Sequence, residues 1–331
     1  MISRAAFEQI LREYDAKRLN AERELSQRRA LIEERVPRVR EIENSIAEIS
    51  VNEAIRRIGG APAENAGEKI HSLIQEKSEV LSAAGFTPDD LKPRYECDRC
   101  QDTGYIGSEM CRCLRERVTE ILYDQSNIKE ILREENFDTF SLRYYPEGQP
   151  LAVAEQALHT ARSFVEDFSD SSDNLFITGG TGVGKTFLTN CIAKDLIDRG
   201  FFVVYLSAVR LFDILSDATF GSRKDGTEGT SRESFKKIIY DCDLLVIDDL
   251  GTEMVNSFTG TQLFDCINER LLGKKHTIIS TNLSLKQIQE NYSERLFSRI
   301  VNRYTLIKLY GDDIRMKKKL EDWDAARRDS D

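Results

Sequence analysis

The sequence predicts an α/β domain with a five-stranded parallel sheet, preceded by an α-helical region that carries a small four-cysteine module. From residue 174 onward, short apolar runs alternate with helix-length segments, which is the pattern of parallel strands joined by helices. A glycine-rich loop follows the first of these runs, and four cysteines cluster upstream of it. We therefore expect a helical region over residues 1–94, the cysteine module with a connecting helix over 95–135, and the α/β domain over 136–331.

Composition narrows the class of protein. The 331 residues carry a net charge of −10, with an isoelectric point near 5.1. This argues against a broad, sequence-blind DNA-coating surface, so any nucleic-acid contact must be a local basic lining. No run approaches the ~18 apolar residues of a membrane span, and the N-terminus is charged throughout, without the apolar region of a signal peptide. A cytoplasmic location without a membrane partner is therefore expected.

Residues 1–58 have an almost continuous helical pattern, in which apolar side chains recur every three or four residues between charges of both signs. This is typical of a helical hairpin or coiled coil, whose apolar stripe packs against its own second arm or against another protein. Pro37 should break or kink the helix, and the glycine pair that starts at Gly59 should end it. The pattern predicts a further helix over Glu68–Ala84 and a new helix N-cap at Thr87.

The cysteine module contains a Cys-x-x-Cys pair and a Cys-x-Cys pair that are separated by ten residues: Cys97, Cys100, Cys111 and Cys113. Four thiolates at this spacing can close a tetrahedron around one Zn²⁺. An all-cysteine shell leaves no position for water, so this zinc would be structural. An iron–sulfur cluster is an alternative, and unrelated reduced cysteines are another. The remaining cysteines lie in apolar segments and should be core residues: Cys191, Cys242 and Cys266.

A phosphate-binding loop follows the first strand of the α/β domain. Leu175–Ile177 is apolar, and the residues after it match G-x-x-x-x-G-K-[ST] and lead into a helix that Gly200 ends. Glycines allow backbone N–H groups to turn towards phosphate oxygens, the lysine brings a charge to the β- and γ-phosphates, and the threonine hydroxyl can bind Mg²⁺. The sequence thus predicts a nucleoside triphosphate site formed by Gly179, Gly180, Thr181, Gly182, Val183, Gly184, Lys185 and Thr186.

The segments around this loop complete the predicted fold. A helix over Leu114–Glu134 should lead out of the cysteine module, and the aromatic segment 136–150 is typical of a domain junction. Its aromatic side chains either dock on the nucleotide domain or lie near an adenine. Leu151–Phe168 predicts a helix, and Gly221–Thr230, which has no apolar residue, should be a mobile loop. The other four strands are expected at Phe202–Leu206, Leu244–Ile247, His276–Ser280 and Tyr304–Leu309.

Polar side chains follow two of the predicted strands at the edge where open α/β sheets bind ligands. Asp248 is expected to hold Mg²⁺ through its waters, and Asp249 to orient or deprotonate the attacking water. Asn282 either hydrogen-bonds the γ-phosphate or the lytic water through its amide, or forms a plain Asx turn. Arg295 and Arg299 share one face of a helix, and surface arginines of this kind are often only solvated.

Five segments of the α/β domain resemble the AAA+ ATPases of the DnaC/DnaI helicase-loader group, whose sister branch is the IstB transposition ATPases. They are, in order, GGTGVGKT, LLVIDDLGTE, LFDCINERLLGKKHTIISTN, ERLFSRI and GDDIR, and the resemblance covers roughly residues 136–331. It implies ATP as the nucleotide and Asn282 as the sensor-one residue. It also implies that Arg299 is an arginine finger, which reaches the γ-phosphate of a neighbouring subunit, and that Arg315 is the sensor-two arginine. Arg295 would then have only a secondary role.

The resemblance further implies an ATP-controlled helicase loader. The helical region and the zinc module would bind the hexameric replicative helicase. The ATPase domains would assemble in a spiral, contact single-stranded DNA and release the helicase after ATP hydrolysis. Many AAA+ proteins have Glu where Asp249 stands, and the shorter carboxylate suggests slow hydrolysis that a partner or DNA regulates. IstB-like proteins commonly lack a four-cysteine insert, which favours a loader. The alternatives are a transposition or phage ATPase that delivers DNA to a recombinase, and a non-hydrolysing nucleotide-gated adaptor.

Overall fold

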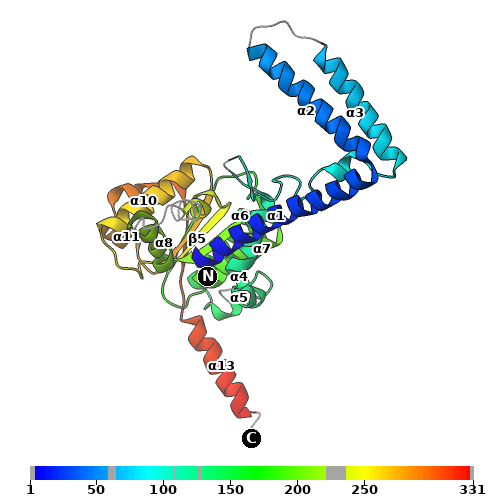
Figure 1. The fold of residues 1–331 in the computed structure, drawn as a ribbon. Helices are drawn as coiled ribbons and strands as arrows, with labels where there is room; N and C mark the ends of the chain where they lie inside the picture. The colour runs from blue at the N-terminus through cyan, green and yellow to red at the C-terminus, as the bar shows by residue number, and fades with distance from the viewer. Residues whose placement is uncertain (1–3, 59–64, 108, 125–127, 221–235, 329–331) are drawn as a thin grey trace. The chain divides into compact units, whose positions relative to one another are not determined.

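The computed structural model describes residues 4–58, 65–107, 109–124, 128–220 and 236–328. The chain divides into two compact units, one comprising Gln9–Leu114 and the other Met1–Glu8 together with Arg115–Asp331. Each unit is described by itself (Figure 1). The domain boundaries expected after residues 94 and 135 stay predictions, and the loop expected at Gly221–Thr230 lies outside the described residues.

The larger unit is built on a five-stranded sheet in which all neighbouring strands are parallel. This confirms the predicted fold class. The central strands are apolar on both faces, as expected for a parallel sheet that helices cover on both sides. In the strand before the phosphate loop, for example, Leu175, Phe176 and Ile177 are at most 1% exposed. In spatial order the strands are β4 (Val203–Ser207), β5 (Leu244–Leu250), β6 (His276–Thr281), β3 (Leu175–Gly179) and β7 (Thr305–Leu309).

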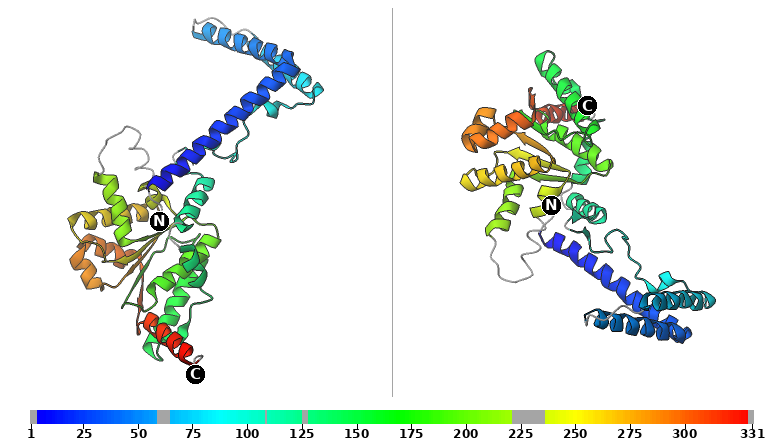
Figure 2. Two further views of the ribbon diagram at one scale, coloured as in Figure 1. Left: turned by 60° about the horizontal axis from the view of Figure 1, so that its bottom comes forward. Right: turned by 90° about the horizontal axis from the view of Figure 1, so that it is seen from above.

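Helices lie on both faces of this sheet (Figure 2). On one face, α6 (Gln149–Glu166) and α7 (Lys185–Asp198) bury apolar side chains against the strands and form the main core. On the other face, α8 (Ala208–Phe220) and α10 (Ser257–Leu272) pack against β4, β5 and β6, and α12 (Glu294–Arg303) packs against α10. The short helix α11 (Leu285–Asn291) precedes α12. The loops at the carboxyl ends of the strands are thereby left to form a ligand site.

The aromatic junction segment docks on this core. Phe137, Phe140 and Leu142 pack against the buried cluster beneath α6 and α7, and Tyr145 belongs to the cluster itself. The predicted connecting helix corresponds to α4 and α5, with residues 125–127 outside the described part of the chain. The remaining elements of this unit are α4 (Arg112–Asp124), α5 (Ile128–Glu134), the short helix η2 (Leu142–Tyr144) and the last helix α13 (Ile314–Arg328).

The smaller unit consists mainly of helices. As predicted, the helical run is interrupted at Pro37, because α1 (Arg4–Arg35) ends just before it and α2 (Pro37–Ile58) begins with it. The arm that covers the apolar stripe of α2 is α3 (Ala66–Ala83), not α1. Val39 of α2 packs against Leu81 of α3, and the ion pairs Arg38–Glu76 and Glu43–Lys77 join the same two helices. A short helix η1 (Pro88–Leu91) follows, with the predicted cap at Thr87.

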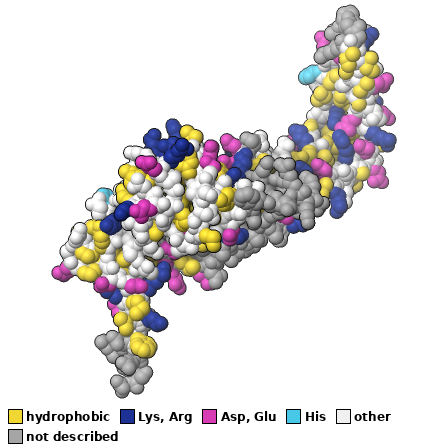
Figure 3. Space-filling model, turned by 90° about the vertical axis from the view of Figure 1, so that its left-hand side faces the viewer, with side chains coloured by type: hydrophobic (Ala, Val, Ile, Leu, Met, Phe, Trp, Pro, Cys, Tyr) yellow, Lys and Arg dark blue, Asp and Glu magenta, His cyan; other side chains and the backbone are white. Residues whose placement is uncertain are grey.

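Several helices leave apolar side chains on the surface, and α2 and α13 are two of them. On α2, Val51, Ile55 and Ile58 are at least 56% exposed, and Figure 3 shows apolar side chains gathered on the hairpin that α2 and α3 form. On α13, Met316 and Leu320 are also exposed, next to basic residues at the lower end of Figure 3. None of the helices within the described residues is both long enough and apolar enough to span a membrane.

Candidate functional site

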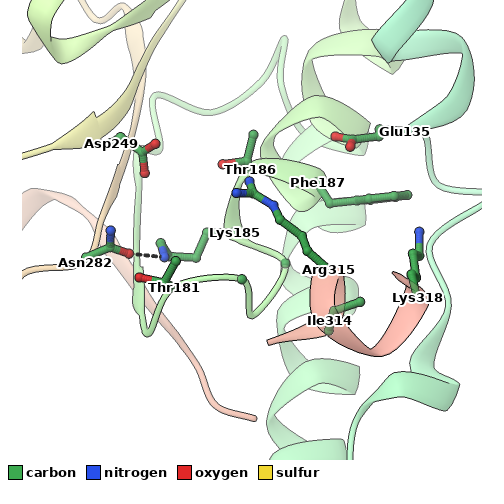
Figure 4. Close-up of a pocket in the computed structure, with 12 residues that line it drawn as sticks. Glu135, Thr181, Lys185, Thr186, Phe187, Asp249, Asn282, Ile314, Arg315 and Lys318 are labelled. Carbon is green, nitrogen blue, oxygen red and sulfur yellow. Dashed lines mark hydrogen bonds between the residues drawn. The ribbon is translucent and has the colours of Figure 1, made fainter. Parts of the chain in front are cut away.

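The phosphate loop joins β3 to α7 and folds around the side chain of Lys185. The Lys185 ammonium donates to the carbonyl oxygens of Gly179 and Gly180 at 3.0 and 2.7 Å, and to Asn282 Oδ1 at 2.5 Å. Figure 4 shows this last contact, which joins the loop after β3 to the end of β6. Asn282 therefore lies at the loop lysine, where a γ-phosphate would be bound, and not in an isolated turn.

The loop can adopt this path only because glycine stands at its crowded positions. Gly182 and Gly184 have φ angles of +74° and +96°. A Cβ at Gly182 would lie 2.1 Å from the Asp313 carboxylate, and one at Gly184 would lie 2.6 Å from the Tyr145 hydroxyl. The same hydroxyl donates to the carbonyl of Val183 at 2.8 Å. The junction segment and the start of α13 thus hold the loop from two sides.

Asp248 is buried near the carboxyl end of β5 and is surrounded by hydroxyl groups. The Tyr205 hydroxyl donates to its carboxylate at 2.9 Å, and the Ser280 hydroxyl donates to the other oxygen. Burial raises the pKa of Tyr205 far above its usual range, so this hydroxyl stays protonated and remains a donor. Thr186 Oγ1 lies 3.4 Å from both carboxylate oxygens. Thr186 and Asp248 therefore offer adjacent oxygen ligands, as a hard cation such as Mg²⁺ requires.

Asp249 has an unusual backbone conformation that turns its side chain away from the strand. Its φ is +55°, and it lies at an irregularity in the pairing of β5 with β6. Its backbone N–H donates to Ser280 Oγ at 2.9 Å, so Ser280 links both carboxylate residues. Burial, followed by the charge of Asp248, raises the pKa of the Asp249 carboxyl, while Lys185 opposes this shift. A half-buried acid of this kind is suited to accept a proton from water.

Lys185, Asp249 and Asn282 line one cavity of about 220 Å³. Burial lowers the pKa of the Lys185 ammonium, and the carboxylates of Asp249 and Asp248 oppose this shift. Arg315 extends from α13 towards Thr186 in Figure 4. The cavity is lined by Glu135, Thr181, Gly182, Gly184, Lys185, Thr186, Phe187, Asp249, Asn282, Ile314, Arg315 and Lys318. The structure thus brings together the phosphate loop, Asp249, Asn282 and Arg315 as the sequence predicts.

A smaller apolar cavity adjoins the first and shares part of its wall. It has a volume of about 40 Å³, and Phe140, Tyr144 and Tyr145 of the junction segment line it together with Gly184 and Phe187. Aromatic rings beside a phosphate loop form a suitable surface for a purine base. The junction aromatics therefore dock on the domain and also line this neighbouring cavity, so the two interpretations of the segment are compatible.

Arg299 lies apart from this cavity. It lines a groove of about 730 Å³ together with Asn174, Lys275 and Thr305, which stand at the amino ends of β3, β6 and β7. The nucleotide cavity is at the carboxyl ends of the same strands. The five residues of β3 extend over about 16 Å at the usual rise per residue, which is longer than an arginine side chain. Arg299 therefore cannot reach the nucleotide cavity of its own chain. Arg295 is exposed and does not line either space.

The four clustered cysteines come together in the smaller unit. Their sulfur atoms all lie within 4.8 Å of one another, with Cys97–Cys111 at 3.8 Å and Cys100–Cys113 at 3.6 Å. A zinc–sulfur bond of ~2.3 Å gives a tetrahedron with edges of about 3.8 Å, so the donor set fits one tetrahedral ion. This spacing favours a single ion over an iron–sulfur cluster, since several metal atoms between the thiolates would separate them further.

The backbone around these cysteines is fixed by side chains that the sequence analysis did not single out. The buried carboxylate of Asp102 accepts N–H bonds from Glu96 and Cys97 at 3.0 and 2.9 Å. Two short strands, β1 (Tyr105–Ile106) and β2 (Glu109–Met110), pair between the cysteine pairs. Tyr14 of α1 is buried beside this cluster, and burial, followed by the neighbouring Cys113 thiol, raises the pKa of its hydroxyl. The cluster is therefore attached to α1 as well as to its own loops.

Sequence comparison identifies the family of the larger unit. A family model described as the IstB-like ATP binding protein matches residues 128–322, which is more than half of the chain. The chain belongs to the IstB-like ATP-binding protein family. The matched range contains the phosphate loop, both carboxylates, Asn282 and Arg315. Membership in this family agrees with the predicted AAA+ group and with the nucleotide cavity described above.

The relatives of this chain include proteins named as replicative helicase loaders and a putative insertion sequence ATP-binding protein, y4pL of Sinorhizobium fredii, which is 28% identical over 158 residues, or 46% of this chain and 61% of that protein. The replicative helicase loader DnaC of Escherichia coli K12 is 25% identical over 178 residues, which are 54% of this chain and 67% of DnaC. DnaC of Buchnera aphidicola subsp. Schizaphis graminum is 23% identical over 221 residues, covering 64% of this chain and 84% of that protein. A crystal structure of the DnaC helicase loader covers 54% of this chain and 98% of its own, with 24% identity and a TM-score of 0.44.

Some side chains at the nucleotide site were not anticipated from the sequence. Tyr205 and Ser280 carry hydroxyl groups within the largely apolar strand sequences VVYLS and TIIST, and these hydroxyl groups were the available signal. Glu135 directly follows α5, Lys318 lies on α13, and nothing in their local sequence marks them as site residues. Glu135 accepts a hydrogen bond from Asn190 of α7 at 2.6 Å, which holds its carboxylate beside the cavity.

Proposed function

We propose that this protein is an ATP-hydrolysing loader that places a hexameric replicative helicase on single-stranded DNA. The observation that carries the proposal is the cavity in which Lys185, Asp249, Asn282 and Arg315 meet. Such a constellation combines a triphosphate-binding loop with a base for water and with cations for the transferred phosphoryl group. The family of the chain and its similarity to DnaC, a replicative helicase loader by name, support the choice of partner. A replication protein of this kind would act in the cytoplasm.

In this proposal each side chain at the cavity has a separate task. Lys185 binds the β- and γ-phosphates, and Thr186 with Asp248 holds the Mg²⁺ that offsets phosphate charge. Asp249 accepts the proton of the attacking water, with Asn282 beside the γ-phosphate to orient it. Arg315 stabilises charge on the nucleotide from α13. The left-handed backbone and the short side chain of Asp249 are consistent with slow hydrolysis that DNA or a partner accelerates.

Arg299 would complete the site of a neighbouring subunit. It stands at the edge of the sheet opposite to its own cavity, which supports a role in trans. An arginine finger of this kind stabilises the charge that develops during phosphoryl transfer, and in other systems it is worth about 10³ to 10⁵ in rate. Self-association through the larger unit is therefore part of the proposal.

The smaller unit would bind the helicase. Val51, Ile55 and Ile58 recur at the i, i+4 and i+7 spacing of one helix face, opposite to the face of α2 that packs on α3. An exposed apolar stripe of this kind suits docking of a partner helix. A structural Zn²⁺ held by the four cysteines would fix the fold of this small unit.

The test uses the full-length chain and the replicative helicase of the same organism. Ile55→Asp should abolish capture of the helicase while ATP binding is retained, because it places a charge on the apolar stripe. Asn52→Asp is the matched control, since Asn52 is an exposed residue of α2 outside the stripe. Capture that survives Ile55→Asp would contradict the assignment of this surface. A protein that does not bind the helicase at all would contradict the loader function.

A transposition ATPase is the second candidate, and the family model itself favours it, since its description names the IstB-like ATP-binding proteins. That function predicts ATP-dependent binding of duplex DNA and capture of a recombinase. Measuring duplex and single-stranded DNA binding side by side separates the two. Preference for single strands supports the loader, whereas preference for duplex DNA supports the transposition ATPase. A non-hydrolysing adaptor is excluded if single-stranded DNA or helicase stimulates steady ATP turnover.

A further inference from the structure

Arg299 is held by a neutral side chain and not by a carboxylate. Its Nε–H and Nη2–H groups donate to Asn268 Oδ1 at 3.3 and 3.2 Å. Its guanidinium carbon lies 5.8 Å from the centre of the Phe264 ring, one helical turn from Asn268 on α10. Within the described part of the chain, Arg299 forms no ion pair, although Asp265 and Glu269 stand next to these two positions on the same helix.

This arrangement leaves one edge of the guanidinium open. The group has five N–H donors in a rigid plane. Asn268 Oδ1 accepts one N–H from Nε and one from Nη2. The opposite edge of the guanidinium, formed by Nη1 and the second N–H of Nη2, is therefore available to bind a ligand. Two parallel N–H groups on that edge match two oxygens of a phosphate group. The Phe264 ring attracts the cation without neutralising it.

We propose that Asn268 is a positioning residue, which holds Arg299 so that its free edge and its full charge face the triphosphate of a neighbouring subunit. This inference rests on the hydrolysis between subunits that is part of the proposed function. An arginine finger by itself does not require any particular neighbour. The inference adds that the side chain that orients Arg299 must be an uncharged hydrogen-bond acceptor. An aspartate at position 268 would accept the same two hydrogen bonds and would also neutralise the guanidinium.

The surroundings of Arg299 agree with an anionic ligand supplied from outside the chain. Lys274, Lys275 and Arg303 line the same groove with Arg299, and they outnumber its acidic lining residue, Asp173. Lys275 also forms an ion pair with Asp243, which lies outside the lining, at 3.1 Å. The groove is thus electropositive at the edge of the sheet where this chain has no phosphate loop of its own. A neighbouring subunit's triphosphate is a ligand with the required charge and geometry.

The experiment measures ATP turnover and ATP affinity at a concentration at which the wild-type protein assembles. Asn268→Asp and Asn268→Ala should each lower kcat roughly 10- to 100-fold with ATP affinity unchanged, because the first removes the net charge of the finger and the second its orientation. Arg299→Ala gives the full effect of losing the finger. Asn291→Asp is the matched control, an equal chemical change at an exposed residue of α11 away from both spaces, and should leave turnover unchanged.

Subunit mixing separates positioning from damage to the fold. When Asn268→Asp is mixed with Lys185→Ala, turnover should recover in part, because the intact ATP site of one subunit can face the intact finger of the other. The inference is wrong if Asn268→Asp protein turns over ATP as fast as wild type. It is also wrong if Asn268→Asp protein is inactive and mixing it with Lys185→Ala protein restores no turnover. Full activity of Arg299→Ala, or a wild-type protein without hydrolysis, would instead refute the proposed function together with the inference.

Discussion

Removing the Ser280 hydroxyl should weaken both the stability of the ATPase unit and its catalysis. Ser280 is fully buried, donates to the Asp248 carboxylate and accepts the backbone N–H of Asp249 at 2.9 Å. A hydrogen bond to a charged group contributes about 1.5–3 kcal/mol and a neutral one about 0.5–1.5. Ser280→Ala should therefore lower the free energy of unfolding by roughly 2–4 kcal/mol, which for a unit of about 200 residues is a fall of about 5–15 °C in Tm.

The catalytic effect of the same substitution follows from the conformation of Asp249. Its positive φ is an uncommon backbone state for a residue with a side chain, and Ser280 supplies the acceptor for its N–H. Without that acceptor the Asp249 carboxylate loses its fixed position, so kcat should fall with little change in ATP affinity. Tyr205→Phe separates the two effects, because it removes only the bond to Asp248 and should lower Tm while largely preserving turnover.

Calorimetric unfolding and steady-state ATP turnover are the assays. Ser207→Ala serves as the matched control, since Ser207 stands beside Asp248 in the sheet but its exposed hydroxyl accepts only a 3.4 Å bond from Arg210 N–H. This control should change Tm by no more than one or two degrees. If Ser280→Ala matched the control in both Tm and turnover, the argument that Ser280 organises the two carboxylates would be wrong.

Three further outcomes are expected. Asp249→Asn should abolish hydrolysis yet raise Tm at neutral pH, because the raised pKa of the Asp249 carboxyl means that its ionisation disfavours the folded state. This gain in Tm should shrink as the pH falls and vanish well below ~4, where the carboxyl is protonated in the unfolded state as well. Purified protein should contain one zinc per chain, and Cys97→Ser or Cys111→Ser should remove it with ATP affinity intact; an iron content would instead indicate a cluster. Asn282→Ala should slow hydrolysis without weakening ATP binding, as measured by separate kcat and binding titrations, and a loss of binding equal to that of Lys185→Ala would contradict its assigned place.

The phosphate loop and the carboxylates were predictable because their chemistry is encoded in contiguous residues. A glycine pattern before Lys185, and two acids after an apolar strand, specify local geometry whatever the rest of the chain does. For Asn282 the sequence left a phosphate contact and a plain Asx turn both open, and the structure places its side chain on Lys185, at the edge where the carboxyl ends of the parallel strands meet. The order of the strands in space was not contained in any of these signals.

The missed residues share a different property, which is that their partners are distant in sequence. Ser280 is 32 residues from Asp248, and Tyr205 is 43 residues from it. Asn268 is 31 residues from Arg299, within a helix whose sequence gives no sign of the contact. Such pairs depend on which strands and helices are neighbours, and that is settled by packing of the whole core. For the same reason the sequence left open whether an arm of the chain or another protein covers the apolar stripe of α2, whose partner α3 lies beyond the glycine pair.

The contacts of Lys185 indicate how nucleotide binding could be coupled to the rest of the unit. An ammonium group has three N–H donors, and Lys185 gives them to Gly179, Gly180 and Asn282. Phosphate oxygens carry more negative charge than these neutral acceptors, so a triphosphate would compete for the same donors and release the amide of Asn282. Asn282 directly follows the last residue of β6 and is two residues beyond Ser280, which holds Asp248 and Asp249. Lys185 is therefore linked, through the residues at the end of β6, to the carboxylates of Asp248 and Asp249, of which the first would hold Mg²⁺ and the second would act on the water.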